Sequence, residues 1–331
     1  MKLALLHVLL GVCTLEALCG YCASAPRKVA TTQILGREYV RLSDWVREAS
    51  LEVHWVKKDE TLKVAGRSST ITLTVDSSEA DFNGVHIRLL YPLARRDGAP
   101  YLSRLDADDT FHPLLYPPAN REGLTVKTIC LDPGHGGREP GYLVQGNQEK
   151  KYTLLLAEEL QEQLKKSGFK VSLTRTSDKQ VELPERPQIA KRRGADLFIS
   201  LHFNSAPSSP RTVRGTEVYC LTPAGAPSTN ARGEGADAGW FPGNRLNEKN
   251  MFLAYQIQRT LTRELAVEDR GVHRARFWVL RDAAMPAILI EGGFMSHPVE
   301  GKKIFDAAYR KQMAKAIVNG VMNYKRAVEG S

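Results

Sequence analysis

Cysteine is scarce in this chain of 331 residues. Three of its five cysteines, Cys13, Cys19 and Cys22, lie within the first 25 residues, and no clean lipobox precedes any of them. Only Cys130 and Cys220 remain in the rest of the chain, which is too few for a disulfide framework. Both fall within predicted strands, so we expect two buried thiols rather than a bridge.

The motifs of several common protein classes are also absent. There is no Gly-x-Ser-x-Gly motif, and Cys130 precedes its turn inside a strand, which argues against a serine or cysteine hydrolase. No nucleic-acid-binding motif is present, and after residue 25 no apolar stretch reaches transmembrane length. The net charge of +9 fits a polyanionic partner, such as an acidic envelope polymer, as well as it fits an ordinary soluble surface.

Residues 1–25 have the pattern of an export signal. Lys2 gives a positive start, an apolar stretch follows from Leu3 to Leu18, and Ala23-Ser24-Ala25 matches the small-x-small pattern of a cleavage site. The sequence therefore predicts an exported protein of the periplasm or cell envelope, or a secreted one. An uncleaved N-terminal anchor is the alternative.

Residues 26–115 have the pattern of a small, mainly β module. Ile71, Leu73 and Val75 alternate with polar residues, as in half-buried strands, and Asn83-Gly84 predicts a tight turn. Residues 116–126 contain Pro117-Pro118 and polar residues, which predicts a linker to a second domain at 127–331. Because every candidate catalytic residue follows this linker, we expect the module to serve envelope binding or placement.

From residue 127 onward, strand and helix patterns alternate. This order predicts an α/β fold, a mostly parallel sheet with helices on both faces, in which ligands bind at the carboxyl ends of the strands. The expected strands are Thr128–Leu131, Val171–Thr174, Leu197–Leu201, Val218–Leu221, Trp278–Leu280 and Ala287–Ile290, and the expected helices are 149–166, 184–193, 249–265 and 303–324.

Four polar residues lie at such positions. His135 sits in the Gly-rich turn after the first strand, Glu149 begins the next helix, and His202 and Glu291 each end a strand. Two histidines and a glutamate suit zinc, and a free carboxylate nearby suits a general base. Each signal has an ordinary alternative as well: a helix-dipole partner, packing histidines, or a phosphate-binding turn, although the turn lacks the Walker lysine and the GxGxxG spacing.

The segment from Ile129 to Tyr324 resembles the catalytic domain of the zinc-dependent N-acetylmuramoyl-L-alanine amidases, the amidase_3 family. The matching stretches occur in the family's order: Leu131–Gly137, Glu149-Lys150, Gly194–Asn204, Gly215–Tyr219 and Pro286–Phe294. The resemblance implies that His135, Glu149 and His202 bind zinc, and that Glu291 is the catalytic carboxylate. It implies hydrolysis of the bond between N-acetylmuramic acid and L-alanine in peptidoglycan. Asn204 is a candidate substrate-binding residue.

The N-terminal module resembles the domain named after the N-terminal region of copper amine oxidases. The name implies no copper here, because His54, His86 and His112 lack ligand spacing. Two stretches depart from the amidase pattern. His297 stands where asparagine is usual, and we expect it on a surface loop. Ala224–Asn250 matches poorly, and is either a lid or regulatory insertion or a plain loop.

Two other functions stay open at this point. A zinc peptidase acting on peptidoglycan stem peptides would use the same metal chemistry, and a non-catalytic wall-binding regulator could keep the fold without activity. All four candidate positions are intact, which favours an enzyme over the regulator. The sequence does not tell whether an activator protein is needed, or which oligomeric state the chain adopts.

Overall fold

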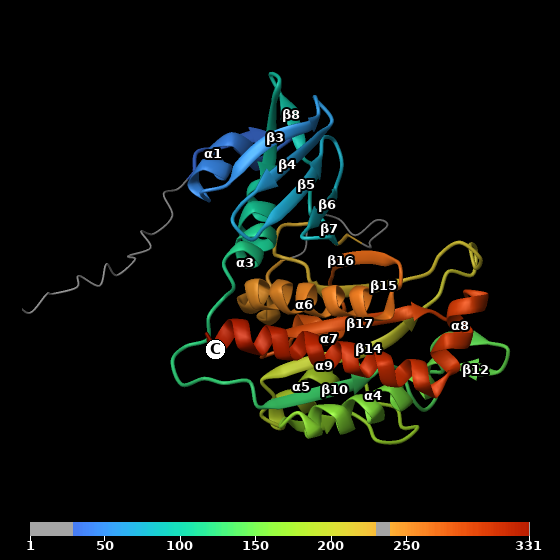
Figure 1. Ribbon diagram of the computed structural model, residues 1–331. Coiled ribbons are helices and arrows are strands. Elements are labelled where there is room, and N and C mark those ends of the chain that lie inside the picture. The colour runs from blue at the N-terminus through green and yellow to red at the C-terminus, as the bar shows by residue number, and fades with distance from the viewer. Residues whose placement is uncertain (1–28, 230–238, 331) are drawn as a thin grey trace, which may run out of the picture.

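The computed structural model describes residues 29–229 and 239–330 (Figure 1). The predicted export signal, with its three cysteines, lies outside these residues. Residues 230–238 of the predicted insertion also lie outside them. Within the described residues, no helix is long and apolar enough to cross a bilayer. Figure 1 shows a β-rich N-terminal part above a larger α/β part.

The N-terminal part consists of short strands and short helices. The alternation of apolar residues buries one face of β5 and β7, and Asn83 and Gly84 both take the positive φ angles that their tight turn needs. The elements, in chain order, are β1 (Thr31–Ile34), β2 (Arg37–Arg41), α1 (Leu42–Glu48), β3 (Glu52–Lys57), β4 (Thr61–Ala65), β5 (Thr70–Thr74), β6 (Glu79–Phe82), β7 (Val85–Arg88), β8 (Ala94–Arg96), β9 (Ala99–Ser103), α2 (Arg104–Asp106), η1 (Ala107–Phe111) and α3 (His112–Leu115).

The α/β part contains a sheet in the order β13-β10-β14-β17-β15-β16. All of its neighbouring pairs are parallel except β15 and β17, which confirms the predicted mostly parallel sheet. Its elements are β10 (Thr128–Pro133), β11 (Leu143–Val144), β12 (Asn147–Gln148), α4 (Glu149–Lys166), β13 (Lys170–Leu173), α5 (Glu185–Arg192), β14 (Leu197–Asn204), β15 (Thr216–Leu221), η2 (Pro242–Leu246), α6 (Asn247–Leu265), β16 (Asp269–Ala275), α7 (Trp278–Arg281), β17 (Ala287–Phe294), α8 (Pro298–Phe305) and α9 (Ala307–Glu329).

Helices cover both faces of this sheet. Successive strand residues point to opposite faces, so Ile129 and Leu131 pack in one apolar cluster with α4, α6 and α9, whereas Cys130 packs in another with α5 and α7. Cys130 and Cys220 are both buried free thiols, as expected.

The two parts share one sheet. Val272 of β16 pairs in parallel with Ile87 of β7, so β7-β6-β5-β4-β3 continue the order of the α/β strands in an eleven-stranded sheet of the described residues. The main apolar cluster likewise includes residues from both parts, from Val40 to Val328. Residues 116–127 form neither helix nor strand, but neither the sheet nor the core is interrupted there. The division into domains stays a prediction.

Three elements differ from the sequence predictions. Trp278–Leu280, expected as a strand, belongs to helix α7, because a short apolar run does not reveal its period. Strand β16 was not predicted, since charged residues interrupt its apolar pattern. The helix expected at 303–324 is two helices, α8 and α9, separated at Asp306, whose extended backbone and side-chain bond to the Tyr309 amide cap α9.

The predicted insertion at Ala224–Asn250 is only partly irregular. Its last residues form η2 and the first turn of α6. Its first residues contact the N-terminal part, where the hydroxyl of Tyr91 donates to the carbonyl of Gly225 over 3.0 Å. These ends are therefore packed against the rest of the protein.

Candidate metal centre and active-site cleft

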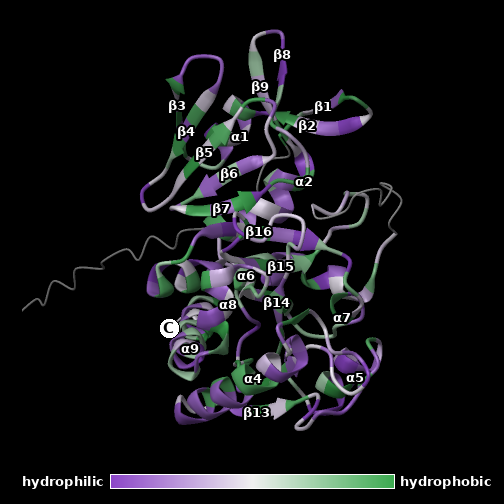
Figure 2. Cartoon of the chain, turned by 90° about the vertical axis from the view of Figure 1, so that its right-hand side faces the viewer, coloured by the Kyte–Doolittle hydropathy of each residue, from purple (hydrophilic) through white to green (hydrophobic). Residues whose placement is uncertain are grey.

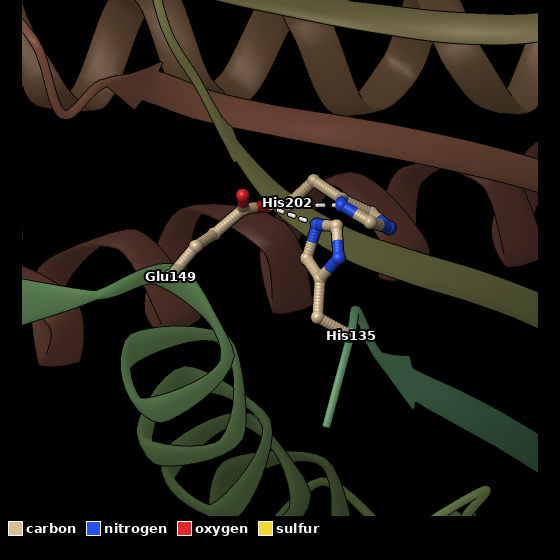
Figure 3. A group of neighbouring side chains, drawn as sticks. All are labelled: His135, Glu149 and His202. Carbon is tan, nitrogen blue, oxygen red and sulfur yellow. Dashed lines mark hydrogen bonds and ion pairs between the residues drawn. The ribbon is translucent and has the colours of Figure 1, made fainter. Parts of the chain in front are cut away.

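Three of the predicted ligands meet at the carboxyl edge of the sheet (Figure 3). His135 lies in the turn after β10, Glu149 is the first residue of α4, and His202 lies near the end of β14. Glu149 Oε1 is 3.1 Å from His135 Nε2 and 3.0 Å from His202 Nδ1. One ligand atom from each residue lies within 4.8 Å of the other two, so the group could hold a metal ion.

Glycines allow this close approach. A Cβ atom on Gly134 would overlap the ring of His202, and one on Gly141 would overlap the carboxylate of Glu149. Gly141 also has a φ of 67°, which disfavours any L side chain. His135 itself has a φ of 59°, so its turn is held in a conformation that a histidine rarely adopts.

Two buried arginines hold that turn in place. Arg186 donates to the Asp132 carboxylate over 2.8 Å, and to the carbonyls of Pro133 and His135 over 3.0 Å each. Arg175 donates to the carbonyls of Pro133 and Gly134. Because guanidinium groups hold several carbonyls at once, they fix the backbone that carries His135. Neither arginine is marked by a local sequence pattern.

The environment of Glu149 favours its ionised form. The side chain is buried, and its oxygens accept from the backbone amides of Tyr142 over 2.9 Å and Phe203 over 3.2 Å. Burial acts to raise the pKa of Glu149, but the hydrogen bonds and charges of His135 and His202 outweigh it and hold the pKa below its usual range. The carboxylate is therefore ready to bind a cation.

Glu291 lies beside this group on β17. It is in register with His202 of β14 on one side and with Glu217 of β15 on the other. Its Oε2 atom is enclosed and has no hydrogen-bond partner among the described residues. Burial, and then the negative charges of Glu149 and Glu217, raise the pKa of Glu291 well above its usual value. Such a carboxylate takes up a proton more readily than an exposed one.

Asn204 also borders the cleft, two residues after His202. Its Nδ2 donates to Glu217 over 2.6 Å, and its Oδ1 accepts from the amide of Ser205 over 2.7 Å. Glu217 in turn accepts from the Tyr219 hydroxyl and from Arg270 over 2.9 Å. The side chain of Asn204 is thus oriented by a buried network that the sequence did not reveal.

These residues line one cleft of about 550 Å³. His135, Glu149 and His202 border it together with Asn204 and Glu291. Leu183, Phe277, Trp278, Val279 and Leu289 add apolar surface to the lining. The sequence-predicted ligands and the predicted base therefore share one open cavity large enough for a small ligand.

The expectation for His297 was wrong. The residue is buried, and its Nδ1 accepts from the backbone amides of Val299 and Glu300, so it caps α8 and does not lie on a surface loop. It does not border the cleft in the described structure. His54, His86 and His112 lie in the N-terminal part and do not belong to the metal-binding group.

Known proteins resemble the α/β part. The chain is 36% identical to the N-acetylmuramoyl-L-alanine amidase AmiC of Neisseria meningitidis over 218 residues, which are 59% of this chain but only 52% of AmiC. It is 32% identical to the uncharacterized protein YqiI of Bacillus subtilis over 61% of this chain and 87% of YqiI.

Solved structures of amidases also resemble the α/β part. The crystal structure of an N-acetylmuramoyl-L-alanine amidase from Clostridium difficile 630 aligns with a TM-score of 0.50 and 32% identity, covering 61% of this chain and 97% of that one. AmiC2 of Nostoc punctiforme also aligns with a TM-score of 0.50, at 31% identity. The sequence family described as Amidase_3, N-acetylmuramoyl-L-alanine amidase, matches residues 129–323. This match covers more than half of the chain, which therefore belongs to the Amidase_3 family.

Proposed function

We propose that this protein is a zinc-dependent N-acetylmuramoyl-L-alanine amidase, which hydrolyses the amide bond between N-acetylmuramic acid and L-alanine in peptidoglycan. The observation that carries the proposal is the meeting of His135, Glu149 and His202 beside Glu291 in one cleft. Membership of the Amidase_3 family, and the amidase names of the relatives, support this substrate.

The donor set fits zinc. Two imidazole nitrogens and one carboxylate oxygen are a common protein contribution to a catalytic zinc site, which leaves a position for water or substrate. His135, Glu149 and His202 would hold the ion, since one ligand atom of each lies within 4.8 Å of the other two. Zinc bound there would polarise the scissile carbonyl and acidify the attacking water.

Glu291 is the proposed general base. Its elevated pKa and its place beside the ligands suit a carboxylate that accepts the proton of the attacking water. The same carboxyl group then gives that proton to the departing alanine nitrogen, because an amine must be protonated as it leaves. Asn204 keeps one Nδ2 hydrogen beyond its bond to Glu217, and we propose that it donates this hydrogen to the substrate.

Peptidoglycan lies outside the cytoplasm, so the proposal requires export. The leader-like residues 1–25 support an exported protein of the periplasm or cell envelope. An activator protein is compatible with this proposal: the solved CwlD amidase from Clostridioides difficile is in complex with the GerS lipoprotein.

Digestion of purified sacculi tests the function. The zinc-loaded protein should release stem peptides with a free N-terminal alanine, and leave glycan strands with bare lactyl groups, as identified by mass spectrometry. The Glu291→Gln protein is the matched control and should release neither. Fragments cut within the stem peptide would identify a zinc peptidase instead. A protein that binds sacculi but releases no fragments would be a wall-binding regulator.

A further inference from the structure

One flank of the cleft is apolar and open. Nine large hydrophobic side chains of the described residues are exposed, and two of these, Leu183 at 42% and Trp278 at 50%, line the cleft. Leu183 precedes α5 and Trp278 begins α7, two helices that contact each other and lie together on one side of the α/β part (Figure 2). Exposed apolar surface at a cleft is typical of a binding surface.

The indole of Trp278 packs against a guanidinium group. The guanidinium of Arg281 lies 4.8 Å from the centre of its ring and 4.9 Å from that of Phe241, so it contacts both aromatic rings. Arg281 is itself anchored, since its Nε donates to the carbonyl of Arg276 over 2.8 Å. A half-exposed tryptophan fixed in this way gives a flat surface that loses little entropy on binding.

The charge of the lining indicates which part of the substrate lies there. The substrate has a sugar on one side of the scissile amide and a stem peptide with free carboxylates on the other. None of the cleft-lining residues in the described chain is lysine or arginine, and Phe277, Val279 and Leu289 beside Trp278 are uncharged. The guanidinium of Arg281 lies against the rings of Trp278 and Phe241 and does not line the cleft, so an acidic peptide would meet no lysine or arginine within the described lining. A pyranose ring, in contrast, presents a C–H face that stacks on an aromatic ring.

We propose that Trp278 is the stacking surface of a saccharide subsite, in which the apolar face of a glycan pyranose ring lies on the indole and Leu183 closes the rim. The inference rests on the proposed amidase function and deepens it. Trp278 positions the glycan and takes no part in bond cleavage, so its loss weakens binding of the sugar and leaves the metal and the base intact.

Product inhibition measures the binding of the glycan half and of the peptide half of the substrate separately. Cleavage of N-acetylglucosaminyl-N-acetylmuramoyl tripeptide is measured for the zinc-loaded full chain, with the free disaccharide or the free tripeptide added as competitive inhibitor. The Trp278→Ala variant should raise the KM, and the inhibition constant of the disaccharide, on the order of tenfold, with kcat and zinc content close to those of the unchanged protein. The inhibition constant of the tripeptide should not change. Trp278→Phe should restore most of the disaccharide affinity.

Trp240→Ala is the matched control, because Trp240 is 58% exposed but does not line the cleft. It should leave both inhibition constants unchanged. The saccharide subsite is refuted if Trp278→Ala weakens the tripeptide instead, which would place the acidic stem against Arg281. Equal weakening of both products, or of neither, also refutes it. If the unchanged protein releases no tripeptide from this substrate, the proposed function itself fails.

Discussion

Replacing Glu291 by Gln should abolish turnover and at the same time stabilise the metal-free protein. The substitution keeps the size of the side chain but removes its negative charge and its capacity to accept a proton. Loss of a general base usually lowers the rate by about 10²–10⁴-fold. Zinc content should stay unchanged, because Glu291 is not among the three grouped ligands.

The stabilising effect follows from the surroundings of Glu291. Its Oε2 is enclosed and finds no hydrogen-bond partner in the described part of the chain, and burial together with the charges of Glu149 and Glu217 raises its pKa. A raised pKa means that the folded protein binds this proton more tightly than the unfolded chain does. The stability contributed by the protonated group is therefore complete below the unfolded pKa of about 4.3, and is lost as the pH rises through the folded pKa.

Gln does not titrate, so the Glu291→Gln protein does not lose stability in this way. Its gain in stability over the unchanged protein should therefore grow as the pH rises above about 4.3. A buried polar group without a partner costs roughly 1–3 kcal/mol, and more when it is charged, so the neutral Gln amide should cost less than the ionised carboxylate by an amount of this order. Each kcal/mol corresponds to about 2–4 °C in Tm for chains of about 150–250 residues, so for this longer chain the shift should be at the lower end of that range. Thermal unfolding of the metal-free proteins across this pH range should therefore show a gain of several degrees at neutral pH, and almost none in acid.

Glu217→Gln is the matched control. Glu217 pairs with Glu291 across the strands, but its carboxylate accepts from Asn204, Tyr219 and Arg270. The same substitution there removes the charge from a satisfied carboxylate, so it should lower the Tm at neutral pH. The reasoning is refuted if Glu291→Gln lowers the Tm, if its effect is independent of pH, or if the enzyme retains its turnover.

Three other perturbations test the rest of the site and the fold. Glu149→Ala should lower both zinc content, measured by mass spectrometry, and activity, since two histidines hold zinc poorly; a fully loaded variant would contradict its role as a ligand. Arg186→Met should weaken zinc binding about 10–100-fold in a chelator competition, because it frees the turn that carries His135. It should also lower the free energy of unfolding in urea by about 3–5 kcal/mol, because Asp132 loses its buried counter-ion. Unchanged zinc affinity would limit Arg186 to a role in the core. A chain starting at Gly123 should have a lower Tm by calorimetry or aggregate in gel filtration, while its folded fraction still cleaves soluble muropeptides. A Tm equal to that of the full chain would show that the shared sheet contributes little to the stability of the α/β part.

The residues near the strand ends could be predicted because local sequence determines their positions, although β14 continues to Asn204 and β17 to Phe294, beyond the ends that the sequence predicted. His135, His202 and Glu291 each follow an apolar run, and parallel strands bring their carboxyl ends to one edge. Glu149 could be placed because the amphipathic pattern of α4 fixes where that helix begins. The geometry of the group then follows from the topology of the sheet.

What the sequence could not reveal are long-range polar contacts. Arg186 is 54 positions from Asp132, and nothing in the local pattern distinguishes it from a solvated arginine. The same holds for Arg274 in β16, which is buried and donates to the carbonyl of Asp109 over 2.6 Å and to the hydroxyl of Thr110. The buried arginine makes these long-range contacts, and it also interrupts the apolar alternation by which a strand is identified. Strand β16 was therefore not predicted.

The N-terminal part bears on the cleft through this strand. Its residues 29–115 contain 11 lysines and arginines against 13 aspartates and glutamates, so the positive charge of the chain does not reside there and gives no reason to assign the part an acidic polymer. Its β7 instead covers β16, which would otherwise be an exposed sheet edge. Arg270 of β16 holds Glu217, and Glu217 orients Asn204 at the cleft. Contacts therefore run without a break from the covered edge to the candidate site, and stabilising that edge is the role that the geometry most directly supports.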